Sequence, residues 1–249
     1  ESREQVLEIC SRTRAICASL GLGYVFKASF DKANRTSLHS YRGPGLEQGL
    51  EILAWVREQE QVPITTDVHL PQQCAPVAEV VDLIQIPAFL SRQTDLLVAA
   101  GSTGKPLNIK KGQFMAPQSM KHAAEKAVCS GAPSVMLTER GTSFGHGDLV
   151  VDMRGLQEMR ELGHLVCFDA THSVQRPSAG QETSGGARRF VPALTRAAVA
   201  VGIDALFAET HPRPDEALSD GPNMIPLDEL RAYLEQVQAI AGASWTWSV

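Results

Sequence analysis

Short apolar segments alternate with helical patterns along almost the whole chain of 249 residues, and this alternation limits the fold more than any other feature. The apolar segments favour strands at 24–30, 64–69, 83–89, 106–112, 134–140, 165–173 and 205–211. Helical spacing of apolar residues predicts helices at 1–20, 46–60, 76–81, 94–100, 119–130, 156–162, 194–201 and 227–241. Strands that alternate with helices in this way form parallel βαβ units, so the sequence predicts an α/β protein.

The length favours a particular arrangement of these units. A (β/α)8 barrel typically needs about 250 residues, and no Pro/Gly/Ser linker divides residues 1–249, so we expect one catalytic barrel domain. The sequence supplies seven strands and opens with a helix, whereas a closed barrel has eight strands. We therefore expect the first strand to lie before Glu1. An open sheet of six or seven strands is the alternative.

The composition excludes several classes of partner. A formal net charge of -5 argues against nucleic acid, and no apolar stretch approaches the roughly 20 residues that cross a bilayer. The 5 cysteines form no CxxC pair, which is typical of reduced thiols in a cytoplasmic protein. The longest connection, 172–189, is rich in Gly, Ser and Pro, and we interpret it as a mobile active-site loop.

Charged or amide side chains follow nearly every predicted strand. The stretch 26–37, FKASFDKANRTS, carries Lys27, Ser29 and Lys32, and taken alone it would usually be a solvated loop. In a barrel, however, the carboxyl ends of all strands converge on one pocket, which would bring in Gln85, Lys110 and Arg140. Four cations suit a ligand with carboxylate and phosphate groups. The competing interpretation is that each cation only pairs with an Asp or Glu of a neighbouring strand.

A second group of residues has the chemistry of a metal site. His172 ends one predicted strand, Glu209 ends the next, and Asp220 follows on the connection after it. One imidazole and two carboxylates form a plausible ligand set for a divalent metal. Their spacing in sequence is too loose to identify a site without the convergence of the strand ends.

Eight blocks of sequence resemble one known family, in order and over essentially the whole chain. They are FKASFDKANRTS, TTDVH, LIQIPAFLSRQTDLL, NIKKGQFMAP, ERGTSFG, FDATHSVQ, SGGARRF and ETHPRPDEALSDGPNMIPL. The chain is similar in these blocks to 3-deoxy-D-manno-octulosonate 8-phosphate synthases. The resemblance implies a homotetrameric (β/α)8 barrel in the cytoplasm that condenses phosphoenolpyruvate with D-arabinose 5-phosphate and water, in lipopolysaccharide precursor biosynthesis.

The resemblance also assigns roles to individual residues. It implies that Lys27, Ser29, Lys32, Gln85, Lys110 and Arg140 hold phosphoenolpyruvate. Asn34, Arg35 and Asp67 would face the arabinose phosphate, whose phosphate group would be taken by Ser184 and by Arg92 of a neighbouring subunit. Asp67, His172 and Lys32 would be the catalytic residues. Asp67 or His172, or a metal-bound water, would manage the proton transfers, and the cations would polarise the aldehyde.

The family implies no organic cofactor and divides into metal-requiring and metal-independent members. The residue that separates them, a Cys or Asn at the end of the first strand, is absent from this sequence. Ser219 precedes Asp220 where metal-independent members often have Cys, so we favour the metal-dependent class, with His172, Glu209 and Asp220 as ligands.

Other functions remain open at this level. A sister synthase would use erythrose 4-phosphate or an N-acyl mannosamine in place of the pentose, and Asn34-Arg35 favours the phosphorylated pentose. An aldolase would use Lys110 to form a Schiff base, and a barrel without catalytic activity would only bind phosphosugars.

Overall fold

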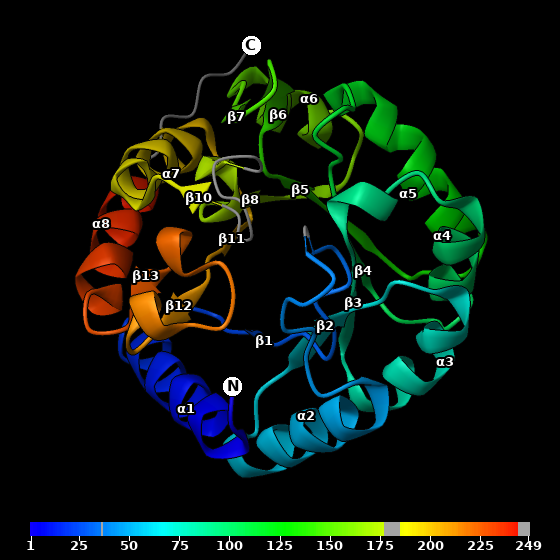
Figure 1. The fold of residues 1–249 in the computed structure, drawn as a ribbon. Helices are drawn as coiled ribbons and strands as arrows, with labels where there is room; N and C mark the ends of the chain where they lie inside the picture. Colours follow the sequence, from blue (N-terminus) through cyan, green and yellow to red (C-terminus); the bar gives the residue numbers. More distant parts are fainter. Residues whose placement is uncertain (36, 177–184, 244–249) are drawn as a thin grey trace.

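The computed structural model describes residues 1–35, 37–176 and 185–243. Its helices form a ring around the strands, which Figure 1 shows end on. In this described part of the chain the ring contains eight α-helices: α1 (Arg3–Ser19), α2 (Leu46–Glu60), α3 (Pro71–Val80), α4 (Thr94–Gly101), α5 (Met120–Cys129), α6 (Arg154–Arg160), α7 (Val191–Val201) and α8 (Leu230–Gly242). Because α1 also packs against α8, the first and last helices are neighbours in the ring.

Among the residues that the structure describes, seven parallel strands form the sheet inside the ring. They are β1 (Phe26–Lys27), β2 (Ile64–Asp67), β3 (Leu83–Ile86), β4 (Leu107–Lys110), β5 (Val135–Glu139), β8 (Leu165–Asp169) and β11 (Ala205–Phe207). Their order in space follows their order in sequence, with β1 and β11 at the two edges. This curled parallel sheet within a ring of helices confirms the α/β barrel-type fold that the alternating pattern predicts.

The strands are apolar because helices cover one face of the sheet and side chains fill the other. Ile84, Ile86, Leu107, Ile109 and Leu137 are fully buried and belong to one core cluster together with apolar residues of the surrounding helices. Strands of a covered parallel sheet need such residues on both faces. No helix in residues 1–35, 37–176 and 185–243 combines the length and the apolar character of a membrane span.

Several predicted elements have different bounds in the structure, and two of these differences have a clear local cause. Helix α3 begins at Pro71, whereas the prediction began at Pro76, because a proline fits the first turn and the Gln73 side chain accepts bonds from the amides of His69 and Leu70. Strand β1 contains two residues of the predicted 24–30, because only Phe26 and Lys27 pair with β2.

Small additional strands surround the carboxyl ends of the sheet. A hairpin of β6 (Thr142–Phe144) and β7 (Asp148–Val150) follows β5, and β12 (Thr210–His211) pairs with β13 (Ile225–Pro226). The connection expected to be a mobile loop contains the pair β9 (Gln175–Arg176) and β10 (Gly185–Gly186). Residues 177–184 between them, including Ser184, lie outside the described residues.

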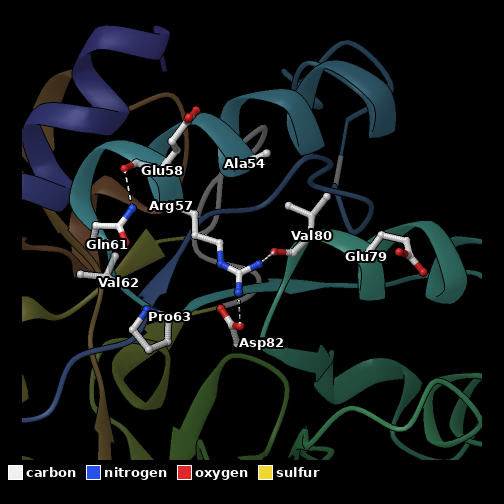
Figure 2. Close-up of a pocket in the computed structure, with 9 residues that line it drawn as sticks. All are labelled: Ala54, Arg57, Glu58, Gln61, Val62, Pro63, Glu79, Val80 and Asp82. Carbon is white, nitrogen blue, oxygen red and sulfur yellow. Dashed lines mark hydrogen bonds and ion pairs between the residues drawn. The ribbon is translucent and has the colours of Figure 1, made fainter.

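The amino-terminal face of the sheet carries one ion-pair arrangement twice. Arg57, at the end of α2, donates to the Val80 carbonyl and to Asp82, which accepts the backbone amide of Ile64 on β2. Figure 2 shows Arg57 between these two partners, in a surface cavity of about 580 Å³.

The second ion-pair arrangement has equivalent partners in the same order along the chain. Arg160, at the end of α6, donates to the Gly202 carbonyl and to Asp204, which accepts the backbone amide of Val166 on β8. We call each set of arginine, carbonyl, aspartate and strand amide an amino-face clasp. Each clasp joins a helix end to the start of two neighbouring strands.

Candidate active site

The functional side chains predicted from sequence lie at the opposite, carboxyl end of the strands. Strand register places Asp67 beside Gln85 and Asp169 beside Phe207. A cavity of about 630 Å³ reaches Lys27, Ser29, Lys32, Gln85 and Glu209 and continues between the edge strands β1 and β11 towards α1 and α8. Side chains from the carboxyl ends of β1, β3 and β11 therefore reach one cavity, in line with the convergence expected of a barrel.

The first wall of the site is a polar chain between β1 and β2. The Lys27 ammonium donates to the Ser29 hydroxyl at 2.6 Å, and this hydroxyl donates to Asp67 at 2.6 Å. Lys27 also lies 3.3 Å from Asp67, whose second oxygen is 3.0 Å from His69 Nε2. Asp67 is thus the common partner of a lysine, a serine and a histidine.

Both members of this ion pair have a perturbed pKa. Burial raises the pKa of Asp67, but Lys27, His69 and Ser29 lower it by more, so the net pKa lies well below the usual value. Burial lowers the pKa of Lys27, but Asp67, Glu209 and Asp220 outweigh that effect, so the net pKa is raised. Both groups are therefore charged near neutral pH.

The second wall is built around Asp169 at the end of β8. This fully buried carboxylate accepts a 2.6 Å bond from Lys110 and lies 2.8 Å from His172 Nδ1. Burial lowers the pKa of Lys110, Asp169 opposes that effect, and the neighbouring cations Lys27 and Arg140 lower it further. Lys27, Lys110 and Arg140 are therefore close enough to influence one another, although they come from three different strand ends.

Arg140 forms the third wall. It is 4% exposed, and burial lowers its pKa, which nearby carboxylates partly offset. Its guanidinium donates to Gln175 at 2.8 Å, and the Gln175 amide donates to Asp220 at 3.2 Å. The sequence did not single out Gln175, because it follows the strand within a loop.

His172, Glu209 and Asp220 come together as the sequence predicted. Their ligand atoms all lie within 4.8 Å of one another, and His172 Nε2 is 3.8 Å from Glu209 Oε1. In the described part of the chain, the buried Glu209 Oε2 accepts no hydrogen bond. One imidazole and two carboxylates whose ligand atoms lie this close together fit a divalent cation. Lys32 lies 3.9 Å from Glu209 and 4.0 Å from Asp220, so it pairs with both carboxylates of this set.

The other predicted residues have fewer contacts with the groups described above. Gln85 is buried against the cavity, and its carbonyl oxygen has no hydrogen-bond partner in the described residues. Arg35 is near enough to Asp220 to lower the pKa of that carboxyl, after the opposing effect of burial and the contributions of His172 and Lys32. Asn34 and Arg92 are exposed.

The site contains further residues to which the sequence gave no role. Lys111 is almost fully buried, lies 3.5 Å from Glu139, and donates to backbone carbonyls of the loops after β4 and β5. Phe207 lies under Lys110, whose ammonium is 3.8 Å from the ring centroid. The pairs Lys110-Lys111 and Glu139-Arg140 were visible as charged strand ends, but the sequence does not show which member faces the cavity.

Comparisons with known proteins agree on one family. The sequence model described as "DAHP synthetase I family" matches residues 1–243. A relative named 2-dehydro-3-deoxyphosphooctonate aldolase from Cyanothece sp. is 57% identical over 243 residues, which cover 98% of this chain and 89% of the relative. Proteins of the same name from Desulfatibacillum aliphaticivorans (54% identical, 98% of this chain, 89% of the relative) and Syntrophotalea carbinolica (57%, 96% and 87%) are equally similar.

Proposed function

The chain belongs to the DAHP synthetase I family, and from this premise we propose that it is a 3-deoxy-D-manno-octulosonate 8-phosphate synthase. It condenses phosphoenolpyruvate with D-arabinose 5-phosphate and water and releases phosphate. The product is a precursor of lipopolysaccharide, and we place the enzyme in the cytoplasm. The observation that carries the proposal is the gathering of Lys27, Lys110 and Arg140, which come from three strand ends and lie close enough for Lys27 and Arg140 to lower the pKa of Lys110.

These cations bind the phosphate and carboxylate groups of phosphoenolpyruvate. Lys27 and Lys110 already have carboxylate partners, Asp67 and Asp169, which hold them charged and oriented before the substrate arrives. Preorganised charge of this kind lowers the cost of binding and stabilises charge that develops during the reaction. Ser29 and Gln85 add neutral groups that fix the orientation of the ligand.

The reaction forms one carbon–carbon bond. C3 of phosphoenolpyruvate attacks the aldehyde carbon, whose oxygen takes up a proton, and positive character develops at C2. Water adds at C2 and loses a proton, and the C2–O bond to phosphate then breaks as the new C2 hydroxyl becomes the ketone and passes its proton to the departing phosphate. Lys32 polarises the aldehyde, while Asp67 and His172 are placed to manage the two protons. Asn34 and Arg35 face the pentose phosphate.

We further propose that His172, Glu209 and Asp220 hold a divalent metal. The four cations Lys27, Lys32, Lys110 and Arg140 are matched by four carboxylates, Asp67, Asp169, Glu209 and Asp220. A ligand with a phosphate and a carboxylate brings roughly three further negative charges. A divalent cation offsets about two of them, and it supplies Lewis-acid chemistry when bound. Metal analysis of the protein before and after treatment with a chelator tests this proposal.

We propose a homotetramer in which Arg92 completes the site of a neighbouring subunit. Arg92 is exposed on the connection after β3, three residues beyond Phe89, and the rings of Phe89 and Phe114 are also exposed. Exposed apolar rings beside a charged residue are typical of an interface. In a mixture of Arg92→Ala and Asp67→Asn subunits, hybrid oligomers should regain activity, because some sites then contain both native residues. No recovery after verified subunit exchange would contradict the role of Arg92 across subunits.

Phosphate release tests the main proposal. The protein is incubated with phosphoenolpyruvate and arabinose 5-phosphate, and then with erythrose 4-phosphate or an N-acyl mannosamine in place of the pentose. We expect release with the pentose and much less with the other two aldoses. Release only with another aldose would identify a sister synthase, and no release with any of them would refute the proposal.

One observation supports a second candidate. The lowered pKa of Lys110 is also a property of lysines that form Schiff bases in aldolases. Borohydride reduction in the presence of phosphoenolpyruvate or pyruvate separates the two functions. An aldolase of this type would form a stable adduct on Lys110, whereas the synthase would not.

A further inference from the structure

We infer that Asp169 is a positioning residue that fixes the phosphoenolpyruvate-binding cation Lys110 and the metal ligand His172 with one carboxylate. The inference rests on the proposed function, because it concerns the same two sites. Asp169 belongs to neither proposed ligand set. It lies behind both and would act through the two side chains that it holds.

One oxygen of Asp169 contacts both side chains. Asp169 Oδ2 is 2.6 Å from Lys110 Nζ and 2.8 Å from His172 Nδ1. The carboxylate has no exposed surface. Burial raises the pKa of Asp169, but His172 and Lys110 lower it by more, so the net pKa lies below the usual value. A buried anion between the Lys110 ammonium and the His172 imidazole has little freedom to move. A displacement of either partner therefore shifts the other.

The second oxygen connects Asp169 to the other half of the metal site. Asp169 Oδ1 accepts the backbone amide of His172 at 3.0 Å and the Thr171 hydroxyl at 3.4 Å. The same hydroxyl accepts the backbone amide of Glu209 at 3.2 Å. Asp169 thus orients one proposed metal ligand directly and the backbone of a second through Thr171.

Phe207 supports the arrangement from below. Its strand register places it opposite Asp169, the Lys110 ammonium lies 3.8 Å from its ring centroid, and the His172 ring lies 5.8 Å away. Lys110 and His172 are therefore each held between an anion and one shared aromatic ring. With Nδ1 of His172 turned towards Asp169, Nε2 is the nitrogen that faces Glu209. A carboxylate behind a ligating histidine typically changes metal affinity or activity by about 10- to 100-fold.

The test compares Asp169→Asn with Asp204→Asn. Asp204 is a matched control, because it also joins β8 to β11 but belongs to an amino-face clasp at the other end of the strands. Mn²⁺ affinity is measured by calorimetry. Phosphoenolpyruvate affinity is measured separately with EDTA present, so that it does not depend on the metal. Kinetics give KM for each substrate.

We expect Asp169→Asn to weaken Mn²⁺ binding and phosphoenolpyruvate binding by about tenfold each. KM for phosphoenolpyruvate should rise while KM for arabinose 5-phosphate stays within about twofold, a split that general structural damage would not produce. Asp204→Asn should leave both affinities unchanged. Unchanged affinities in Asp169→Asn, or a loss confined to one of them, would overturn the inference.

Two further results remain decisive. If the unaltered protein binds no Mn²⁺, the metal proposal fails, and the phosphoenolpyruvate affinity of Asp169→Asn alone decides the inference. If Asp169→Asn does not fold, Thr171→Val takes its place, because it removes only the hydroxyl between Asp169 and Glu209. That variant should weaken Mn²⁺ binding about threefold and spare phosphoenolpyruvate binding, and unchanged Mn²⁺ affinity would overturn the inference.

Discussion

Replacing Asp67 by asparagine should destabilise the protein without substrate and make its stability depend strongly on phosphoenolpyruvate. The substitution leaves Lys27 as a buried cation without its carboxylate, since the Lys27 side chain is only 15% exposed. Breaking a buried ion pair costs about 3–5 kcal/mol. Asparagine still accepts a bond from Ser29, and Ser29 still accepts one from Lys27, so we expect a loss of about 3 kcal/mol. For a chain of this size that loss lowers Tm by roughly 6–12 °C.

Phosphoenolpyruvate should reverse part of this loss, because its anionic groups supply a new partner for Lys27. In a thermal-shift assay, saturating phosphoenolpyruvate should raise the Tm of Asp67→Asn by more than it raises the Tm of the unaltered protein. Asp82→Asn is the matched control, because it breaks an ion pair at the other end of β2. That pair is about one-third exposed or more, so its loss should cost about 1 kcal/mol or less, and phosphoenolpyruvate should not compensate for it specifically.

The effect also has a defined pH dependence. The pKa of Asp67 lies below its usual value in the folded protein, so the stabilisation is complete above the unfolded pKa of about 4 and is lost as pH falls through the folded value. The difference in Tm between the unaltered protein and Asp67→Asn should therefore be constant from pH 7 to about 5 and narrow in more acidic solution. A Tm within 2 °C of the unaltered protein at pH 7, or equal gains with phosphoenolpyruvate, would refute the reasoning.

Four other predictions concern the site itself. Arg140→Lys should raise KM for phosphoenolpyruvate about tenfold in steady-state kinetics, because lysine lacks the planar fork that binds an anion through two bonds. Glu209→Gln should reduce the metal content measured after dialysis against Mn²⁺, since an amide is a weaker ligand than a carboxylate. Borohydride treatment with phosphoenolpyruvate should leave Lys110 unmodified in peptide mass spectra, and an adduct there would favour the aldolase. Arg92→Ala should raise KM for arabinose 5-phosphate and leave KM for phosphoenolpyruvate unchanged, and equal changes in both would contradict its assigned role.

The sequence predicted the order and type of the elements well, because each strand carries a continuous apolar run and each helix has helical spacing. It predicted bounds less well where tertiary contacts decide them. Strand β1 is short because pairing with β2 ends at Lys27, although Ala28 and Phe30 continue the apolar pattern. Helix α3 starts early because Gln73 supplies side-chain bonds that no periodicity reveals.

The candidate site followed from one rule, that carboxyl ends of parallel strands converge. This rule found Lys110, Arg140, His172 and Glu209 without knowledge of their partners. It did not find what holds them, because partners such as Gln175 are determined by loop geometry. It also gave no role to Asp169, since a strand-end carboxylate that binds a ligand and one that orients its neighbours look alike in sequence.

The two amino-face clasps suggest a twofold pattern in the architecture. One clasp begins on α2 and the other on α6, and these helices lie on opposite sides of the ring in Figure 1. Four βα units separate them, which is half of the eight helices that the described residues form. In each clasp the arginine lies at the end of one helix, and the aspartate lies just before the second strand that follows that helix. The same contacts are therefore repeated four βα units apart at the start of the strands. The repeated ion pairs hold the strands in register where the strands begin, whereas the proposed substrate site lies at the opposite end, where the strands finish.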